Sequence, residues 1–326
     1  MERRELRSGY TTGTCAAAAA KAAAAFLLTG RCPESVDVAL PCGKTVEMRV
    51  SAGGSAGQPE RSANQAGGSA GQPEKSAERG KVPDAGRTAR VQKDAGDDPD
   101  VTHGTWICGS VSKISQDCLE EWKKSGAGYW LEEYPGLYLT GGAGIGMVTK
   151  PGLSCPVGHY AINPVPRKMI LSAVEEACRK AAYEGCLCVR ISIPEGERLA
   201  AKTFNPRLGI EGGISVLGTT GMVKPMSEEA LTATIQLDIH MKAVSGQRTL
   251  LMAPGNYGEA FLQEQMGVTL GSAVLCSNFV REAAMMAAEE EIPNLLFVSH
   301  MGKLVKVSAG MENTHSRYGD GRMDQM

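Results

Sequence analysis

Residues 250–258 read Leu-Leu-Met-Ala-Pro-Gly-Asn-Tyr-Gly, an apolar run that ends in a loop of small and polar residues. A short apolar run between turn signals is typical of a buried strand. The rhythm recurs through the second half of the chain as four apolar runs with helical segments between them. The runs are Ile214 to Leu217, Leu250 to Ala253, Ala273 to Cys276 and Leu295 to Val298, and the helical segments are Ser227 to Val244, Gly258 to Met266 and Val280 to Glu291. This alternation predicts a parallel sheet covered on both faces.

Each of these runs continues into a loop of small and polar residues. In open parallel sheets, ligands bind outside the carboxyl ends of the strands. We therefore expect a small-molecule site there, with one candidate for substrate binding, His300, and several for cofactor binding. The cofactor candidates in these loops are Thr219, Thr220, Gly255, Asn256 and Asn278.

The first half of the chain has a different pattern. Two strands, Val36 to Leu40 and Thr45 to Val50, flank a turn and predict a hairpin. Further strands and one long helix are expected in the following segments: strands at Trp106 to Val111, Gly136 to Leu139 and Val189 to Ile193, and a helix at Met169 to Tyr183. We predict an α+β N-terminal domain over residues 1–211 and an α/β Rossmann-like domain with a parallel sheet over residues 212–326.

Residues 51–90 contain almost no large apolar side chain and include a duplication. Gly-Gly-Ser-Ala-Gly-Gln-Pro-Glu at residues 53–60 recurs at residues 67–74. Such a composition cannot offset its ordering entropy by burial. We predict a flexible low-complexity insertion without a chemical role.

The composition is that of an ordinary globular protein, with 42% hydrophobic and 21% charged residues in 326. A formal charge of -2 argues against nucleic acid or an anionic membrane as the main partner. The Ala-rich run after Cys15 is interrupted by Lys21, and we judge it too short to span a bilayer. Ten scattered cysteines and five histidines without zinc spacing predict a reduced, cytoplasmic protein with no metal site. The oligomeric state, including a homo-oligomer, stays open.

The sequence Gly-Tyr-Thr-Thr-Gly-Thr-Cys at residues 9–15 joins a hydroxyl-rich turn to an Ala-rich helix. Thr12 or Thr14 can cap this helix, and the exposed amides of its first turn make an anion site. Thr11, Thr12 and Thr14 are therefore candidate substrate-binding residues, against the alternative of a capped helix that needs no ligand. Cys15 lies where a thiol pKa tends to fall, but we favour a buried small residue, because no base lies nearby in sequence.

A glycine-rich loop over residues 141–146, Gly-Gly-Ala-Gly-Ile-Gly, follows a predicted strand. Its G-x-G-x-G spacing lets the backbone approach a nucleotide or a methionine-derived cofactor, so Gly142, Gly144 and Gly146 are candidate cofactor-binding residues. Pro151 argues against a long helix starting there. A tight turn beside another pocket explains the loop equally well.

An acidic loop at residues 93–103 holds several carboxylates and His103. Such a loop can hold a general base or a cation, although acidic residues beside Gly and Pro are also turn formers. Arg167 and Arg207 lie in two Pro-containing turns and suit the capture of substrate carboxylates. Together with the threonines, these arginines indicate a polyanionic ligand.

Several blocks of the chain resemble the CbiD family, the cobalt-precorrin-5B C-1 methyltransferases of anaerobic cobalamin biosynthesis. The similar blocks lie at residues 6–16 (Leu-Arg-Ser-Gly-Tyr-Thr-Thr-Gly-Thr-Cys-Ala), 93–100, 163–167, 204–221 and 255–258. The resemblance covers essentially the whole chain apart from the insertion.

This resemblance implies S-adenosylmethionine as methyl donor and a macrocycle with many carboxylate arms as acceptor, with cobalt only as part of the substrate. The product would be cobalt-precorrin-6A. An electron-rich ring carbon attacks the sulfonium methyl group in line, so positioning and charge balance carry the catalysis. Asp97, Asp98 and Glu211 are candidate catalytic carboxylates that stabilise the sulfonium or accept a proton.

The chain departs from the family pattern in two places. Residues 158–161 read Gly-His-Tyr-Ala where the family has Gly-Glu-Pro-Ala. The C-terminus is shorter than the family pattern, so we expect the parallel domain to be truncated there. Two rival functions remain. One is an enzyme that uses a nucleotide or nicotinamide cofactor, which is weakened because no acidic residue ends the second strand of a G-x-G-x-x-G unit. The other is a non-catalytic carrier of a corrinoid intermediate.

Overall fold

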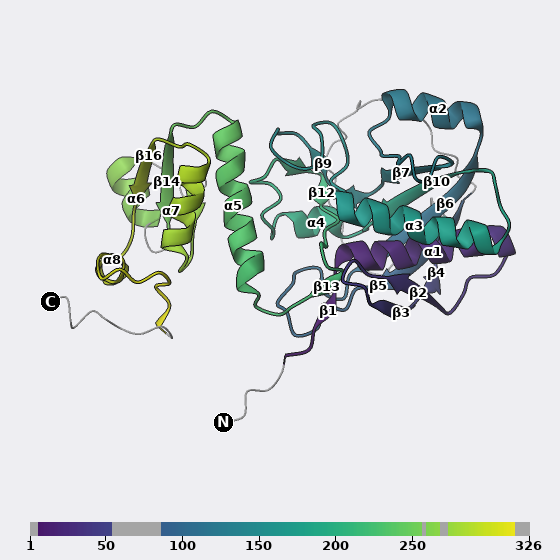
Figure 1. Cartoon of the computed structure of the whole chain (residues 1–326), viewed down its shortest axis with the longest axis horizontal. Coiled ribbons are helices and arrows are strands. Elements are labelled where there is room, and N and C mark those ends of the chain that lie inside the picture. The colour runs from purple at the N-terminus through teal and green to yellow at the C-terminus, as the bar shows by residue number, and fades with distance from the viewer. Residues whose placement is uncertain (1–5, 54–85, 256–258, 268–272, 317–326) are drawn as a thin grey trace, which may run out of the picture. The chain divides into compact units, whose positions relative to one another are not determined.

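The computed structural model describes residues 6–53, 86–255, 259–267 and 273–316 (Figure 1). The chain forms two compact units. Unit 1 comprises residues 1–149 and 154–225, and unit 2 comprises residues 150–153 and 226–326. Both units mix helices with small sheets, some of which contain parallel strands. The protein is therefore a mixed α/β protein.

Unit 1 is built around a five-stranded sheet with the strand order β4-β5-β6-β10-β7. The strands of this sheet are β4 (Ser51–Ala52), β5 (Arg87–Gln92), β6 (Trp106–Ile114), β7 (Leu137–Gly141) and β10 (Cys186–Ser192). The helices of unit 1 are α1 (Thr12–Thr29), α2 (Gln116–Ser125), α3 (Pro164–Lys180) and α4 (Gly196–Ala200). The hairpin predicted in the first half is confirmed as the antiparallel pair β2 (Ser35–Ala39) and β3 (Thr45–Arg49).

Six short strands form three further pairs in unit 1. These strands are β1 (Gly9–Tyr10), β8 (Gly144–Ile145), β9 (Met147–Val148), β11 (Ile210–Glu211), β12 (Gly213–Ile214) and β13 (Met222–Val223). β1 pairs with β13 and β9 with β11, both antiparallel, while β8 and β12 are parallel. The β1 and β13 pair joins the beginning of unit 1 to its last segment, whereas the other two pairs join residues 144–148 to residues 210–214.

Helix α1 begins and ends as its caps dictate. At the N-terminus, the side chain of Thr11 accepts a hydrogen bond from the amide of Thr14. Thr11 is therefore the cap, and the prediction of Thr12 or Thr14 was wrong. Gly30 ends the helix in the left-handed region with φ 79°. This helix is long and apolar enough to cross a membrane, so the prediction that the Ala-rich run is too short was wrong. However, 72% of the window is buried inside the unit, as in the core helix of a globular domain.

The alanines of α1 allow the helix backbone to lie directly on the sheet. A Cβ built on Gly109 of β6 would stand 2.5 Å from the amide nitrogen of Ala20, so the strand and the helix meet without intervening side chains. Helix α3 lies beside α1 over the same face (Figure 1). The two helices bury the apolar face of the sheet, including Ile107, Val189 and Ile191. This packing fixes the N-termini of α1 and α3 in unit 1.

Unit 2 contains a parallel sheet with the order β15-β14-β16. Its strands are β14 (Thr249–Ala253), β15 (Val274–Leu275) and β16 (Asn294–Phe297), and its helices are α5 (Glu228–Val244), α6 (Glu259–Met266), α7 (Val280–Glu289) and α8 (Met301–Ser308). Met252 and Val274 pack with α5 and α7 on one face, and Ala253 packs with Leu262 of α6 on the other. The prediction of a parallel sheet covered on both faces is confirmed for these three strands.

Two sequence predictions need correction. The run beginning at Ile214 was expected in the parallel sheet of the second half, but β12 pairs with β8 inside unit 1. The predicted insertion at residues 51–90 is not flexible at its ends, because Ser51 and Ala52 of β4 pair with Arg90 and Ala89 of β5. Residues 54–85, including the duplication, lie outside the described residues.

Candidate functional site

The threonine turn, residues 9–15, is bonded to a second loop of unit 1, residues 217–221. The amide of Gly13 donates to the carbonyl oxygen of Leu217 at 2.8 Å. The Thr12 hydroxyl accepts from the Leu217 amide at 2.8 Å, and the Thr14 hydroxyl donates to the carbonyl oxygen of Gly221 at 2.7 Å. The first-turn amide and the threonine hydroxyls that the sequence predicted to bind an anion therefore hold the two loops together.

The same loop brings Thr219 and Thr220 next to the threonine turn. Both side chains are exposed, and the Thr220 hydroxyl bonds to the backbone of Met222. The sequence analysis predicted Thr219, Thr220, Gly255 and Asn278 as one set of cofactor-binding residues. The two threonines belong to unit 1, whereas Gly255 and Asn278 belong to unit 2. In unit 1 the exposed hydroxyls beside the turn are thus those of Thr219 and Thr220, whereas Thr11, Thr12 and Thr14 are buried.

Cys15 follows the threonine turn and is completely buried. Burial raises the pKa of its thiol to about 12, and nearby Lys93 only partly opposes this. The thiol stays protonated at physiological pH, as expected for a small packing residue rather than a nucleophile.

The acidic loop supports the residues that precede the threonine turn. The Asp97 carboxylate accepts from the Arg7 amide at 2.8 Å, and the Arg7 guanidinium donates to both oxygens of Asp94. The hydrogen bond from Arg7 lowers the pKa of Asp94 to about 2. The amide of Tyr10 donates to the carbonyl oxygen of Asp94 at 2.8 Å. The loop therefore positions β1, while Asp98 lies half-buried in the same loop.

Lys93 is the most buried charge of this loop, with a side chain that is 1% exposed. Its ammonium group pairs with Asp100 and donates to the Thr102 hydroxyl at 2.7 Å. Burial opposes ionisation of Asp100, but Lys93 and Thr102 outweigh it, so the pKa of Asp100 is lowered. The pairing of Lys93 with Asp100 fixes the conformation of the loop.

The glycine-rich loop is filled by its own surroundings. A Cβ on Gly144 would stand 1.9 Å from the carbonyl oxygen of Ile193, and one on Gly146 would stand 2.3 Å from the Ile210 side chain. The amides of Gly142 and Gly146 donate to carbonyl oxygens of neighbouring strands. At Gly144 and Gly146 the absence of a side chain serves close backbone packing within unit 1.

Arg167, in the first turn of α3, is held by three neighbours. Its Nε donates to the carbonyl oxygen of Ile162 at 2.5 Å, and one terminal nitrogen donates to Cys155 Sγ at 3.1 Å. The guanidinium carbon lies 3.5 Å from the ring centroid of Tyr129. Arg167 is therefore a rigidly oriented cation near the N-terminus of α3.

Arg207 and Glu211 lie close together in sequence and belong to unit 1. The guanidinium carbon of Arg207 lies 5.7 Å from the Phe204 ring centroid. Glu211, in β11, has an exposed side chain whose Oε1 accepts from the Thr149 hydroxyl at 3.3 Å. The described partner of Glu211 is thus a side-chain hydroxyl, whereas that of Asp97 is the backbone amide of Arg7.

In unit 2, three predicted residues follow the carboxyl ends of neighbouring strands. Gly255 follows β14, Asn278 follows β15 and His300 follows β16, whereas Asn256 lies outside the described residues. Among the described residues, a Cβ at Gly255 would meet no atom within 4 Å, which leaves room for a ligand to approach the backbone there. The His300 imidazole caps α8, accepting from the amide of Gly302 at 3.2 Å.

Sequence reasoning missed Lys303 of α8. Its ammonium group donates to the carbonyl oxygen of Ser277 at 3.1 Å and to Asn278 Oδ1 at 2.9 Å, which ties α8 to the end of β15. Burial lowers the pKa of Lys303. A signal was present in the sequence, because a lysine three residues after the candidate His300 falls in the first turn of a helix that follows a strand.

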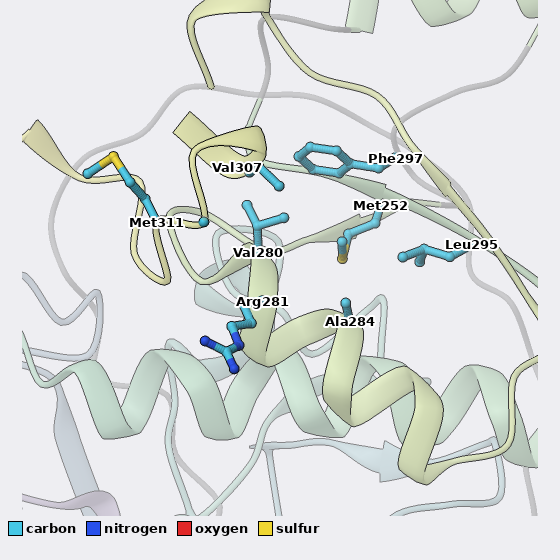
Figure 2. A pocket seen from close by; sticks show the side chains of 9 residues that line it. Met252, Val280, Arg281, Ala284, Leu295, Phe297, Val307 and Met311 are labelled. Carbon is cyan, nitrogen blue, oxygen red and sulfur yellow. The ribbon is translucent and has the colours of Figure 1, made fainter. Parts of the chain in front are cut away.

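Unit 2 also has an apolar pocket of about 390 Å³ (Figure 2). Figure 2 shows side chains from β14, β16, α7 and α8 around it. The lining residues are Met252, Val280, Arg281, Ala284, Leu295, Phe297, Val307, Gly310 and Met311. Its volume lies within the usual range for small-molecule sites, roughly 300–1,000 Å³. Arg281, the charged lining residue, pairs with Glu312.

Comparison with known proteins gives consistent matches over nearly the whole chain. A family model described as CbiD matches residues 1–72 and 70–225. The cobalt-precorrin-5B C(1)-methyltransferases of Ruminiclostridium cellulolyticum and Moorella thermoacetica are each 40% identical, over 98% of this chain and 72% and 74% of their own length. That of Salmonella typhimurium is 38% identical over 98% of this chain and 72% of its own length.

One solved structure also matches. It is a crystal structure of the cobalamin biosynthesis protein (cbiD) from Archaeoglobus fulgidus, with 25% sequence identity and a TM-score of 0.46. The match covers 98% of this chain and 84% of that one.

Proposed function

Because the chain belongs to the CbiD family, we propose that it is a methyltransferase that methylates C-1 of cobalt-precorrin-5B to give cobalt-precorrin-6A. The observation that carries this proposal is the 40% identity over 98% of the chain to a cobalt-precorrin-5B C(1)-methyltransferase. The substrate is a corrinoid, and its cobalt belongs to the substrate. S-adenosylmethionine supplies the methyl group as a sulfonium, so no protein nucleophile is required.

The test is a transfer assay with isotopically labelled methyl donor and the cobalt macrocycle. The product is expected to gain one labelled methyl group on the ring, while the donor is recovered as S-adenosylhomocysteine. A macrocycle that binds saturably but is recovered unmethylated in the presence of donor would favour the carrier function instead.

We place the donor in unit 2, residues 150–153 and 226–326, which we propose to be a Rossmann-like domain. Two features support this choice over the glycine-rich loop of unit 1. No atom of the described residues lies within 4 Å of a Cβ built at Gly255, whereas the space at Gly144 and Gly146 is taken by neighbouring backbone and side chains. Unit 2 also combines an apolar pocket with the polar Asn278 near the strand ends, and a ligand with an adenosyl part and a charged part needs both.

A pocket-filling variant tests the donor site. Ala284 is half-buried and lines the pocket, and Ala288 lies one turn further along α7 with an exposed side chain. The Ala284→Phe variant should weaken S-adenosylhomocysteine binding in calorimetry by at least about tenfold, the loss of about 1.4 kcal/mol. The Ala288→Phe variant is the matched control and should bind as the unaltered protein does. Equal affinity in both variants would exclude the pocket.

For the acceptor, we propose that carboxylate arms bind unit 1 at Arg167 and Arg207, with Thr219 and Thr220 as the available hydroxyls beside the threonine turn. Arg167 supports this role because Tyr129 and Ile162 hold its guanidinium in one orientation before any ligand arrives. The Arg207→Ala variant should weaken macrocycle binding far more than donor binding. Equal loss of both ligands in titrations would contradict the assignment.

Among the candidate carboxylates, we propose Glu211 as the group that balances charge or accepts a proton. Its side chain is exposed and its described partner is the Thr149 hydroxyl, while Asp97 is bonded to a backbone amide. The Glu211→Gln variant should lower kcat at least about tenfold with little change in binding. Unchanged kcat would return the role to Asp97 or Asp98.

We further propose that the enzyme works in the cytoplasm, where the corrinoid is its small-molecule partner.

A further inference from the structure

The five-stranded sheet of unit 1 has a second face, opposite α1 and α3. Side chains alternate between the faces of a strand. Since Val189 and Ile191 of β10 belong to the core beneath the helices, Arg190 and Ser192 point to the other face. At one end, this outer face is covered by α2, whose Leu119 and Trp122 pack in a cluster with Cys188. The end around Arg190 lies beyond this cluster.

Arg190 lies in a row of hydroxyl side chains set by the strand register. It is opposite Ser110 of β6 on one side and opposite Thr140 of β7 on the other. Ser110 is in turn opposite Thr88 of β5, and their hydroxyls are 2.8 Å apart. In the next row, Ser192 is aligned with Arg90 across β6. Hydroxyls and guanidinium groups are therefore the polar groups at this end of the face.

The outer face holds two arginines among neutral side chains of its own strands, and Arg90 Nε donates to Ser51 Oγ at 3.4 Å. The outward positions of the five strands hold Arg90 and Arg190 and no Asp or Glu. Within the described part of the chain, Arg190 forms no ion pair. Arg90 lies with its guanidinium carbon 4.4 Å from the ring centroid of Trp106, a side chain that is 37% exposed. A flat aromatic surface thus accompanies the cationic groups.

The glycine-rich loop makes room for Arg190. A Cβ on Gly142 would stand 3.0 Å from Arg190 Cδ and 3.1 Å from Cγ, so the loop after β7 passes directly beside the stem of this arginine. This contact restricts the side chain and limits the entropy lost when its guanidinium binds an anion.

We infer that the outer face around Arg190 and Trp106 binds the edge of a planar macrocycle through one of its carboxylate arms. The inference rests on the proposed function, which supplies such a ligand. A guanidinium group pairs with a carboxylate through two parallel hydrogen bonds. Arg190 can therefore bind one arm of the ring, with Trp106 against the apolar edge.

The test compares a charged corrinoid with an uncharged one. The probes are cobyrinic acid, whose arms are free carboxylates, and its fully methyl-esterified form. The Arg190→Gln variant should bind cobyrinic acid about tenfold more weakly, the loss of one charge-assisted interaction of about 1.4 kcal/mol. Its affinity for the ester should change less than about twofold. The Arg190→Lys variant should recover part of the lost affinity.

Arg179 of α3 provides the control, because it is an exposed arginine of the same unit outside this face. The Arg179→Gln variant should bind both probes as the unaltered protein does. If the Arg190→Gln and Arg179→Gln variants bind cobyrinic acid equally, or if Arg190→Gln weakens acid and ester alike, the inference is wrong.

Transfer kinetics separate this inference from the proposed function. The Arg190→Gln variant should raise the KM for the macrocycle about tenfold and leave kcat nearly unchanged, because the group acts on substrate binding. An unaltered protein that fails to methylate the macrocycle would refute the proposed function. An active protein whose KM does not respond to Arg190→Gln would refute only the role of this face.

Discussion

Gly218 lies directly against the side chain of Thr11, the residue that caps α1. A Cβ built on Gly218 would stand 2.2 Å from Thr11 Oγ1, and Gly218 has a φ of 138°, which other residues rarely adopt. The Oγ1 atom is the acceptor for the Thr14 amide. The loop at residues 217–221 therefore requires glycine for its own conformation and for the helix cap beside it.

The Gly218→Ala variant is expected to lose stability through both effects, by about 3 kcal/mol in total. Gly212 is the matched control, because it has a φ of 76° and no atom of the described residues lies within 4 Å of a built Cβ. The Gly212→Ala variant should lose only the backbone contribution, about 1 kcal/mol. All three tryptophans lie in unit 1, so urea unfolding followed by tryptophan fluorescence reports on this unit. Equal losses would show that the contact with Thr11 is unimportant.

The Arg7 and Asp94 pair predicts a pH dependence of the stability of unit 1. The folded state lowers the pKa of Asp94 from 3.8 to about 2. A lowered folded pKa adds stability that is fully present above pH 3.8 and is lost as the pH falls towards 2. Because the Asp94 side chain is 43% exposed, solvent screening limits this contribution to about 1 kcal/mol.

Urea unfolding of the unaltered protein and the Asp94→Asn variant checks this dependence. The difference in unfolding free energy should be constant from pH 5 to pH 7 and should shrink between pH 3.8 and pH 2. A difference that grows on acidification has the opposite sign and would contradict the assigned pKa shift.

The strands and helices of unit 2 were largely predictable because their signals are local. Runs of four apolar residues bounded by turns indicated β14 and β16, and Ser227 caps α5 where the sequence placed its start. The location of Ile214 was not predictable in this way. Its strand pairs with Gly144 and Ile145, and this contact depends on glycines 69 residues apart packing backbone to backbone. Nothing near Ile214 in the sequence distinguishes this pairing from membership in the larger parallel sheet.

The candidate site was predictable only as residue types. Strand ends and arginine turns were found from sequence, and Gly255, Asn278 and His300 do follow neighbouring strand ends. The partners of each group depend on tertiary contacts. The Thr12 hydroxyl bonds to Leu217, which is 205 residues away, so the sequence could not show that this hydroxyl is already engaged. Arg190 was overlooked because its neighbours Ser110 and Thr140 come from other strands.

Burial of Cys15 predicts that its thiol is unreactive. Its pKa of about 12 leaves almost no thiolate at pH 8, and its side chain is 0% exposed. Cys42, in the turn between β2 and β3, is exposed. Iodoacetamide treatment of the folded protein, followed by peptide mass mapping, should modify Cys42 and leave Cys15 intact. In urea both cysteines should react. Alkylation of Cys15 at the rate of Cys42 in the folded protein would contradict the buried, protonated state.

The buried pair of Lys93 and Asp100 predicts strong coupling between the two residues. Lys93 is 1% exposed, so removing its partner leaves an ammonium group in the interior with only Thr102 as a described acceptor. The Asp100→Asn variant should lose about 3 kcal/mol of unfolding free energy. The Lys93→Met variant removes the buried charge itself, and the remaining Asp100 is 24% exposed and still accepts from Thr102. Its loss should be smaller.

The double variant Lys93→Met with Asp100→Asn separates this coupling from independent damage at each position. In the Lys93→Met background, the Asp100→Asn change no longer leaves a buried ammonium group without its partner. The loss of unfolding free energy in the double variant should therefore fall below the sum of the single losses by at least about 1 kcal/mol. The exposed pair of Lys168 and Glu133, with side chains 62% and 57% exposed, provides the control. Glu133→Gln should cost less than about 1 kcal/mol. Strictly additive losses at Lys93 and Asp100 would mean that burial, rather than their pairing, stabilises the acidic loop beneath the threonine turn.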